Sequence, residues 1–226
     1  MNGVARATRL MSGWGLKYFD YDNDGEIDLF LANGHPDDMI DSYSMQVKYR
    51  EPLLLFHQGA DHKLHDVSEG AGPAFQRDYA ARGLAVGDFD NDGALDVLVG
   101  NNGAAPLLLK NNAAKGNNWL GLKLEGVTSN RDAIGARISW EAGGKVRRML
   151  KTSGGSYLSS HDPRVVLGIA DATIVDAVEI HWPAPSKQVD RLTKVSPNRY
   201  IHVVEGKGIV ASNDSHTQKP AGQANS

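Results

Sequence analysis

Two short segments of the sequence place four carboxylates at a spacing that suits a divalent cation. Each segment has aspartate at its first, third, fifth and ninth positions. The carboxylates are those of Asp20, Asp22, Asp24 and Asp28 in the first segment and of Asp88, Asp90, Asp92 and Asp96 in the second. Carboxylates held this close repel one another by roughly 1 kcal/mol per pair even in a water-like dielectric. The pattern therefore indicates a bound cation that offsets the repulsion.

Calcium fits these loops better than magnesium does. It accepts about six to eight oxygen ligands in flexible geometry, whereas magnesium demands a tight octahedron and keeps several waters. Gly25 and Gly93, at the sixth position, allow the backbone to turn where a Cβ would clash. The seventh residue, Glu26 or Ala94, would offer its backbone carbonyl, and the change from Glu to Ala fits a ligand whose side chain is not used. We predict two Ca²⁺ sites.

Two alternatives compete with this interpretation. Asp-Asn-Asp-Gly also forms ordinary turns, although two copies with all four carboxylates in register favour metal binding. An EF-hand shares the same opening, but its loop ends with a bidentate Glu at about the twelfth position and lies between two helices. Here that position holds Leu31 or Val99, and the flanking residues are typical of strands. The EF-hand alternative is therefore rejected.

The loops belong to a longer repeated unit of strand, acidic turn and strand. Residues 15–33 align with residues 83–101, and nine of the nineteen aligned pairs are identical. The apolar runs at 27–31 and 95–99 are typical of strands covered on both faces. Further strands are predicted at 53–57, 64–67 and 107–110, with a short helical insertion at 37–49.

The second half of the chain has a different pattern, which predicts a compact all-β domain. Its predicted strands are 119–125, 136–141, 145–151, 164–169, 175–182 and 199–205. The predicted organisation is a leader without clear structure at 1–13, the repeats at 14–112, a linker at 113–118, the second domain at 119–205 and a disordered tail at 206–226.

Composition excludes several classes of function. The 226 residues carry a net charge of −3 and no dense basic patch, so no nucleic-acid partner is predicted. No apolar run approaches the ~18 residues of a membrane span, and residues 1–13 do not resemble a signal peptide. There is no cysteine, which excludes disulfides and thiolate chemistry.

No catalytic motif is apparent. Ser156, Ser159, His161 and Asp162 lie close in sequence, but no Gly-x-Ser-x-Gly turn accompanies them. We therefore predict no enzyme activity. The histidines at 57, 62 and 65 are expected to be solvated, as is the pair at 147–148 on a strand edge.

The acidic repeats resemble the FG-GAP (VCBS) repeats of integrin-α-like β-propellers. Three further stretches, at 130–136, 153–159 and 178–183, resemble the ASPIC/UnbV domain, which follows such repeats in the cartilage acidic protein 1-like family. The resemblance implies an all-β fold, with two propeller blades (a partial propeller) followed by a β-sandwich-like ASPIC/UnbV domain. It assigns the metal ligands to the eight aspartates and to the backbone carbonyls of Glu26 and Ala94. Where family members have Phe-Gly-Leu-Gly, this chain has Leu-Gly-Ile-Ala at 167–170.

The resemblance also implies a function. It predicts a non-catalytic, calcium-stabilised binding or adhesion module with an unknown protein or carbohydrate ligand, located outside the cell or in the cell envelope. The alternatives are part of a secreted enzyme with an unrecognised active site, or a purely structural remnant. Because propellers close with roughly four to eight blades, two repeats predict the C-terminal portion of a longer protein. The exposed blade edges then predict self-association.

Overall fold

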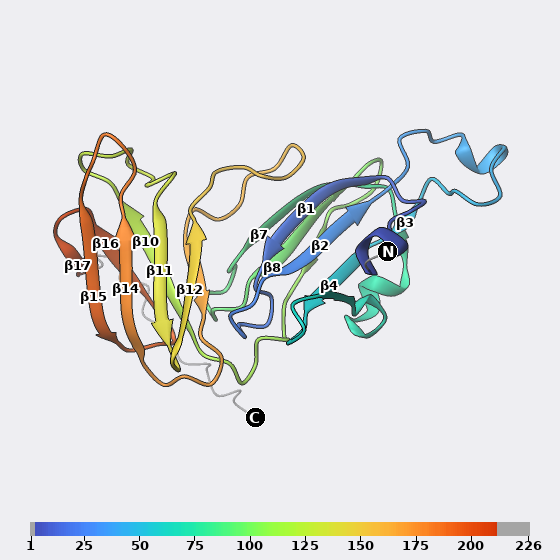
Figure 1. The fold of residues 1–226 in the computed structure, drawn as a ribbon. Coiled ribbons are helices and arrows are strands. Elements are labelled where there is room, and N and C mark those ends of the chain that lie inside the picture. Colours follow the sequence, from blue (N-terminus) through green and yellow to red (C-terminus); the bar gives the residue numbers. More distant parts are fainter. Residues whose placement is uncertain (1–2, 212–226) are drawn as a thin grey trace, which may run out of the picture.

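Two lobes of β-structure lie side by side in the computed structural model, which describes residues 3–211 (Figure 1). The first lobe contains two sheets that carry the repeats, and the second contains two further sheets packed face to face. The predicted all-β architecture, with two blades and a sandwich-like domain, is confirmed.

The sheets of the first lobe are antiparallel. The first has the order β1-β2-β4-β5, the second has the order β7-β8-β9, and a small ribbon joins β3 to β6. Their bounds are β1 Gly13–Phe19, β2 Asp28–Asn33, β3 Glu51–Pro52, β4 Leu54–Gln58, β5 Leu64–Asp66, β6 Asp78–Tyr79, β7 Ala81–Gly87, β8 Asp96–Asn101 and β9 Leu107–Leu109. Each acidic loop joins the first two strands of its sheet, as the repeat predicted.

The two sheets pack against each other like neighbouring propeller blades. Alternate side chains of each sheet enter the shared core, including Phe30, Leu55, Leu84 and Val99. Every residue of β2 is buried, as expected for a strand covered on both faces. In β8, by contrast, Leu98 remains 47% exposed, because no further sheet covers that face of the second blade within the described residues.

A short helix covers the outer face of the first blade. α1 (Gly3–Ala7) packs Val4 and Ala7 against a cluster that includes Leu29 and Phe56. The sequence predicted no clear structure for 1–13, and a five-residue helix has too few turns to show a periodic pattern. The helical insertion predicted at 37–49 is reduced to the 3₁₀ turn η1 (Ile40–Ser42), and two further 3₁₀ turns are η2 (Ser68–Gly70) and η3 (Pro73–Gln76).

The second lobe is a sandwich of two four-stranded sheets, ordered β13-β10-β16-β17 and β12-β11-β14-β15. Strands β10 and β16 pair in parallel, and the other pairings in these sheets are antiparallel. Their bounds are β10 Trp119–Glu125, β11 Arg137–Ala142, β12 Lys145–Leu150, β13 Val165–Gly168, β14 Val175–His181, β15 Val189–Val195, β16 Arg199–Val204 and β17 Gly208–Val210.

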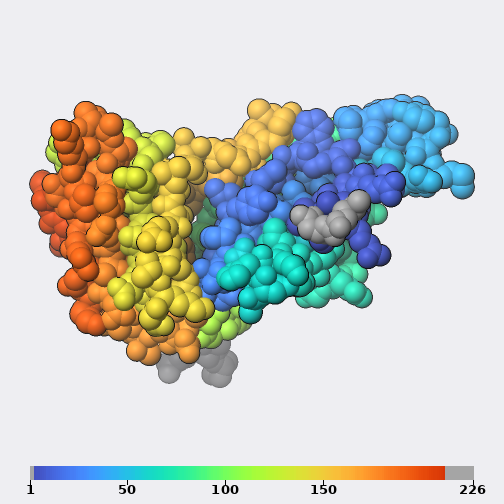
Figure 2. All heavy atoms as spheres, viewed as in Figure 1, coloured from blue at the N-terminus to red at the C-terminus, as the bar shows by residue number. Residues whose placement is uncertain are grey.

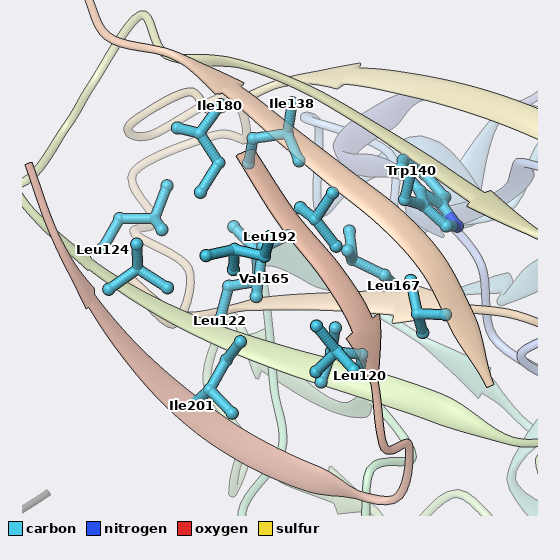
Figure 3. Close-up of a cluster of buried hydrophobic side chains, with 14 of the residues drawn as sticks. Leu120, Leu122, Leu124, Ile138, Trp140, Val165, Leu167, Ile180, Leu192 and Ile201 are labelled. Carbon is cyan, nitrogen blue, oxygen red and sulfur yellow. The ribbon is translucent and has the colours of Figure 1, made fainter. Parts of the chain in front are cut away.

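Aliphatic side chains from both sheets fill the space between them. Leu120 and Leu122 of β10 meet Ile138 of β11 and Ile180 of β14 (Figure 3). Trp140 lies at one side of this core, where its Nε1–H donates to the carbonyl of Gly168 at 3.1 Å.

Two strands of the sandwich were missed by the sequence. β15 places Asp190 beside Leu192 among its buried positions, so its apolar alternation is weak. β17 lies within the tail predicted to be disordered, where it pairs with the edge of β16. The prediction for 206–226 is therefore wrong at β17, and residues 212–226 lie outside the described part of the chain.

Candidate metal centres

We call residues 20–28 loop 1 and residues 88–96 loop 2. Both loops take up the same backbone conformation. Asn23 and Asn91 lie in the left-handed region with φ of 60° and 61°, and Gly25 and Gly93 follow with φ of 86° and 87°. Asparagine and glycine are the residues that tolerate this region. The Asn-Asp-Gly sequence therefore curls each loop so that its carboxylates point inward.

Backbone N–H groups hold the first and ninth carboxylates of each loop in place. The sixth residue donates to the first carboxylate, and the second residue donates to the ninth. The donor–acceptor pairs are Gly25–Asp20 at 2.8 Å, Tyr21–Asp28 at 3.2 Å, Gly93–Asp88 at 2.9 Å and Phe89–Asp96 at 3.1 Å. A residue after the second strand also donates to the ninth carboxylate, Gln58 to Asp28 and Asn111 to Asp96, both at 2.8 Å. The two repeats therefore build one arrangement twice.

The predicted carboxylates converge, with one exception. In loop 1, oxygens of Asp20, Asp22 and Asp28 lie within 4.8 Å of one another, and Asp24 lies equally close to Asp22. In loop 2, the same holds for Asp88, Asp90 and Asp96. Asp92 is not part of that group, and its Oδ1 accepts the N–H of Ala94 at 2.9 Å. These acidic clusters could hold metal ions.

Two buried side-chain oxygens of loop 1, Oδ1 of Asp20 and Oδ1 of Asn23, have no hydrogen-bond partner within residues 3–211. Asp20 is 8% exposed, and its Oδ1 is buried without a donor among the described residues. Burial, followed by the charge of Asp24, raises the pKa of Asp20 to about 8. Burial also raises the pKa of Asp28, to about 6. Clusters of acidic groups are common without a metal, but a buried carboxylate oxygen without a donor lacks the partner that a cation would provide. The residues of loop 1 therefore fit a bound cation.

The seventh residues, Glu26 and Ala94, add no side-chain carboxylate to the acidic clusters found among the described residues. The Glu26 carboxylate accepts a hydrogen bond from Gln58 at 3.2 Å and lies 4.0 Å from the Lys145 ammonium. The Glu26 side chain therefore makes its contacts outside the loop. This agrees with the presence of Ala at the same position of loop 2, which suggested that the side chain is not a ligand. Ala94 is buried.

Each loop is faced by one basic side chain from a neighbouring strand. His57 of β4 places Nδ1 3.1 Å from Asp28 and 3.6 Å from Asp22. Lys110 donates to Asp90 and lies 3.7 Å from Asp92, and this ammonium holds the pKa of Asp90 below its usual range. The prediction that His57 is solvated was wrong, because β4 pairs with β2 and brings the ring over loop 1.

The second lobe contacts both loops directly. Arg147 of β12 donates to the carbonyls of Gly25 at 2.9 Å and Asp24 at 3.0 Å. Tyr200 of β16 donates to the Asp88 carboxylate at 2.6 Å, and Arg164 donates to the Asp88 carbonyl at 2.7 Å. The expectation that Arg147 is solvated was therefore wrong, because its strand lies at the boundary between the lobes.

Of the residues considered as a hydrolase group, Ser156 and His161 join the lobes, and Ser159 makes a local contact. The Ser156 hydroxyl accepts the N–H of Leu16 at 3.2 Å, and the Ser159 hydroxyl donates to the carbonyl of Tyr157 at 2.8 Å. His161 Nδ1 accepts the N–H of Val86 at 3.2 Å. Within residues 3–211 neither serine is hydrogen-bonded to His161. These contacts indicate docking rather than nucleophile activation.

Comparison with known families assigns both halves of the chain. Residues 20–99 match the FG-GAP-like repeat model, and residues 126–210 match the ASPIC and UnbV model. The chain thus combines a segment that matches FG-GAP-like repeats with a segment that matches the ASPIC and UnbV family. FG-GAP repeats of this kind are propeller-type binding modules, and the two blades and the sandwich correspond to the two matches.

Two curated relatives are similar to most of this chain, but the similarity covers only part of each relative. Cartilage acidic protein 1 of Xenopus tropicalis is 28% identical over 174 residues, which cover 73% of this chain and 24% of the relative. Cartilage acidic protein 1 of Homo sapiens is 26% identical over 178 residues, covering 76% and 25%. The chain thus spans about a quarter of the length of these relatives. Within residues 3–211, no helix has the length and apolar character that crossing a membrane requires.

Proposed function

We propose that this chain is a calcium-binding, non-catalytic binding or adhesion module with one Ca²⁺ in each acidic loop. The observation that carries the proposal is the buried, unpaired Oδ1 of Asp20 within a cluster of converging carboxylates. The proposed ligands are the side chains of Asp20, Asp22, Asp24, Asp28, Asp88, Asp90, Asp92 and Asp96, together with the backbone carbonyls of Glu26 and Ala94. Asp92 is included because it occupies the fifth position of loop 2, as Asp24 does in loop 1, where that carboxylate lies close to Asp22.

Calcium in this proposal acts on structure. It neutralises the carboxylates that β1–β2 and β7–β8 bring together, and it orders the carbonyls of Asp24, Gly25 and Asp88 that the second lobe contacts. The ion therefore stabilises each blade and also the junction between the blades and the ASPIC/UnbV domain. We place these units at 14–112 and, because β17 belongs to the sandwich, at 119–210, joined by a linker at 113–118.

The proposed location is outside the cell or in the cell envelope, and the proposed partner is a protein or a carbohydrate. Calcium modules of extracellular proteins bind with a Kd on the order of 10⁻⁴–10⁻³ M, a range that suits an environment rich in calcium. The uncovered face of the second blade exposes Phe89 by 75%, Leu108 by 54% and Leu98 by 47%. A contiguous apolar face of this kind favours association with another chain, including a second copy.

Thermal unfolding in calcium, magnesium and chelator tests the proposal. A ligand that binds only the folded state adds RT ln(1 + [L]/Kd), about 2.7 kcal/mol at one hundred times Kd. At 10 mM CaCl₂ the melting temperature should rise by roughly 5 °C or more. The same concentration of MgCl₂ should produce a much smaller rise, and EGTA should reverse the calcium effect. An identical melting temperature in all three solutions would refute calcium binding.

A further inference from the structure

The two lobes enclose a cavity of about 460 Å³ beside loop 1. In Figure 2 the surface is hollowed between the blue strands of the first lobe and the yellow strands of the second. Strands β1 and β7 form one wall, and β11, β12, β13 and the segment 151–164 form the other. A volume of this size at a domain junction is typical of small-molecule sites, which span about 300–1,000 Å³.

Much of the cavity wall is apolar. Val86 and Leu95 line it from the blades, and Trp140, Met149 and Val166 line it from the sandwich. Against this wall, the few polar groups decide what the cavity accepts.

His161 contributes a hydrogen-bond donor that lacks an acceptor. Its Nδ1 accepts the N–H of Val86 at 3.2 Å, so the proton of the neutral ring resides on Nε2. Nε2 is buried and has no hydrogen-bond partner among the described residues. Burial and the charge of Lys17 lower the pKa of His161 to about 4, so the ring is neutral at pH 7. A buried N–H without an acceptor is unfavourable, and a ligand oxygen would satisfy it.

Four cationic side chains line the same cavity. Lys151 already donates to the Pro163 carbonyl at 2.6 Å, and Arg164 is paired with Asp162. Lys17 enters from β1 and Arg148 from β12, and neither forms an ion pair or a side-chain hydrogen bond within residues 3–211. Burial lowers the pKa of Lys17, as expected for an ammonium group without a carboxylate beside it. Of the two acidic residues that line the cavity, Asp162 is paired with Arg164 at 2.6 Å, and Asp20 belongs to loop 1.

Lys17, Arg148 and His161 thus offer donors to the cavity, and among the described residues that line it, the one carboxylate outside an ion pair is that of Asp20. We propose that it binds a small oxyanion, a carboxylate or a sulfate, whose oxygens accept hydrogen bonds from Lys17, Arg148 and His161. The apolar wall would hold the body of the ligand, and the volume suits a molecule the size of an acidic monosaccharide. The cavity borders loop 1 through Asp20, but Lys17, Arg148 and His161 are not proposed calcium ligands, so the anion site does not depend on which ion loop 1 takes.

Imidazole ¹⁵N spectra of the folded chain test the proposal, because they report on His161 itself. Acetate, glucuronate and sulfate would be titrated separately at constant ionic strength and constant calcium. Saturable shifts of His161 Nε2 are expected, with His202, which pairs with Glu125 at 3.0 Å in the far sheet, as the internal reference. A stronger response to glucuronate than to sulfate identifies a carboxylate ligand, and the reverse order identifies a sulfate. Either result supports the site.

Two variants make the test specific. Lys17→Met should weaken the response of His161 at least tenfold, whereas the matched change Lys187→Met, at an exposed turn between β14 and β15, should leave it unchanged. Arg148→Gln, on an exposed position, provides the same test should Lys17→Met fail to fold. The proposal is overturned if none of the three anions gives a saturable shift, or if the shift survives both cavity variants unaltered.

Discussion

Loop 1 and loop 2 have the same fold but different neighbours. In loop 1, Asn23 is buried, and the half-buried ring of His57 lies near the carboxylates. In loop 2, Asn91 and Asp90 are exposed, and the ammonium group of Lys110 is already paired with Asp90. Burial therefore raises the pKa values of Asp20, Asp22 and Asp28 in loop 1 and that of Asp96 in loop 2, where Lys110 in addition lowers the pKa of Asp90.

This difference shows that two loops with the same sequence pattern can have the same metal ligands and still differ in their affinity for the metal. Without a metal, loop 1 holds buried carboxylates that repel one another. A bound cation would therefore offset a large electrostatic repulsion. Loop 2 has an ammonium group that partly replaces the metal and must be displaced from Asp90 for calcium to bind. We therefore expect loop 1 to bind calcium more tightly than loop 2.

The largest expected effect comes from removing one carboxylate from each loop. Asp22→Asn should reduce the affinity of loop 1 at least tenfold, about 1.4 kcal/mol, and should remove more than half of the rise in melting temperature produced by calcium. The matched change Asp90→Asn should remove a smaller part of that rise in melting temperature. Calcium-dependent thermal unfolding measures both.

The comparison also predicts opposite effects without calcium. In chelator, Asp22→Asn should stabilise the chain, because burial and Asp24 raise the pKa of Asp22 and the charged form is unfavourable. Asp90→Asn should not stabilise the chain, because the Asp90 carboxylate is paired with Lys110. If Asp22→Asn and Asp90→Asn reduced the calcium-induced rise in melting temperature equally, the two loops would be equivalent.

The pH dependence of stability should follow loop 1. In calcium-free buffer, Asp20 and Asp28 have folded-state pKa values of about 8 and about 6, both above the unfolded value near 3.8. Their protonated forms favour the folded state, so this stability is complete below the unfolded pKa and is lost as pH rises through about 6 and then about 8. The melting temperature should therefore rise as pH falls from 8.5 to 5 (roughly the window set by these pKa values).

Calcium should reverse this dependence, since protons and calcium compete for the same oxygens. The gap between calcium and calcium-free melting temperatures should be widest at the alkaline end and narrow on acidification. Asp20→Asn should flatten the calcium-free profile, and the matched Asp88→Asn should leave most of it in place. A flat profile for the unmodified chain would contradict the assigned burial of loop 1.

A smaller effect is expected from the cation at loop 2. Replacing Lys110 with methionine removes a competing charge, so the affinity of loop 2 for calcium should rise about fivefold. Isothermal titration calorimetry measures the change, and Lys187→Met is the matched control at a distant exposed position. An unchanged or weaker loop 2 would show that Lys110 assists the site instead of competing with calcium.

The smallest effect concerns the contact between the second lobe and loop 1. The N–H of Ala170 donates to the carbonyl of Asn23 at 2.9 Å, and Ala170 is held at a φ of 52°. Glycine, unlike alanine, adopts this conformation without strain. Ala170→Gly should stabilise the chain by about 0.5 kcal/mol, whereas the nearby Ala172→Gly should destabilise it by a similar amount. Chemical denaturation would measure both, and a loss of stability in Ala170→Gly would count against strain at that position.

The sequence predicted the loops because their ligand set is local. The four carboxylates, the left-handed asparagine and the glycine lie within nine residues, and the adjacent apolar runs mark the strands they connect. The strands of the sandwich were predicted for the same reason wherever apolar and polar residues alternate, as in β10 and β14.

The surroundings of the loops could not be predicted in this way. His57 and Lys110 reach the carboxylates because β4 pairs with β2 and because residue 110 follows β9, beside β8. Arg147, Arg164 and Tyr200 reach the loops only because the second lobe docks there. Such contacts depend on register and domain arrangement, which no local pattern encodes.

Calorimetric titration of the metal-stripped chain with CaCl₂ tests the central claim most directly. We expect heat from two non-identical sites, the tighter one lost in Asp22→Asn and the weaker one lost in Asp90→Asn. The tighter site should have a Kd near 10⁻⁴ M, on the order expected for extracellular modules. The absence of saturable heat, with both loops intact and the chain folded, would contradict the assignment of residues 20–28 and 88–96 as calcium sites.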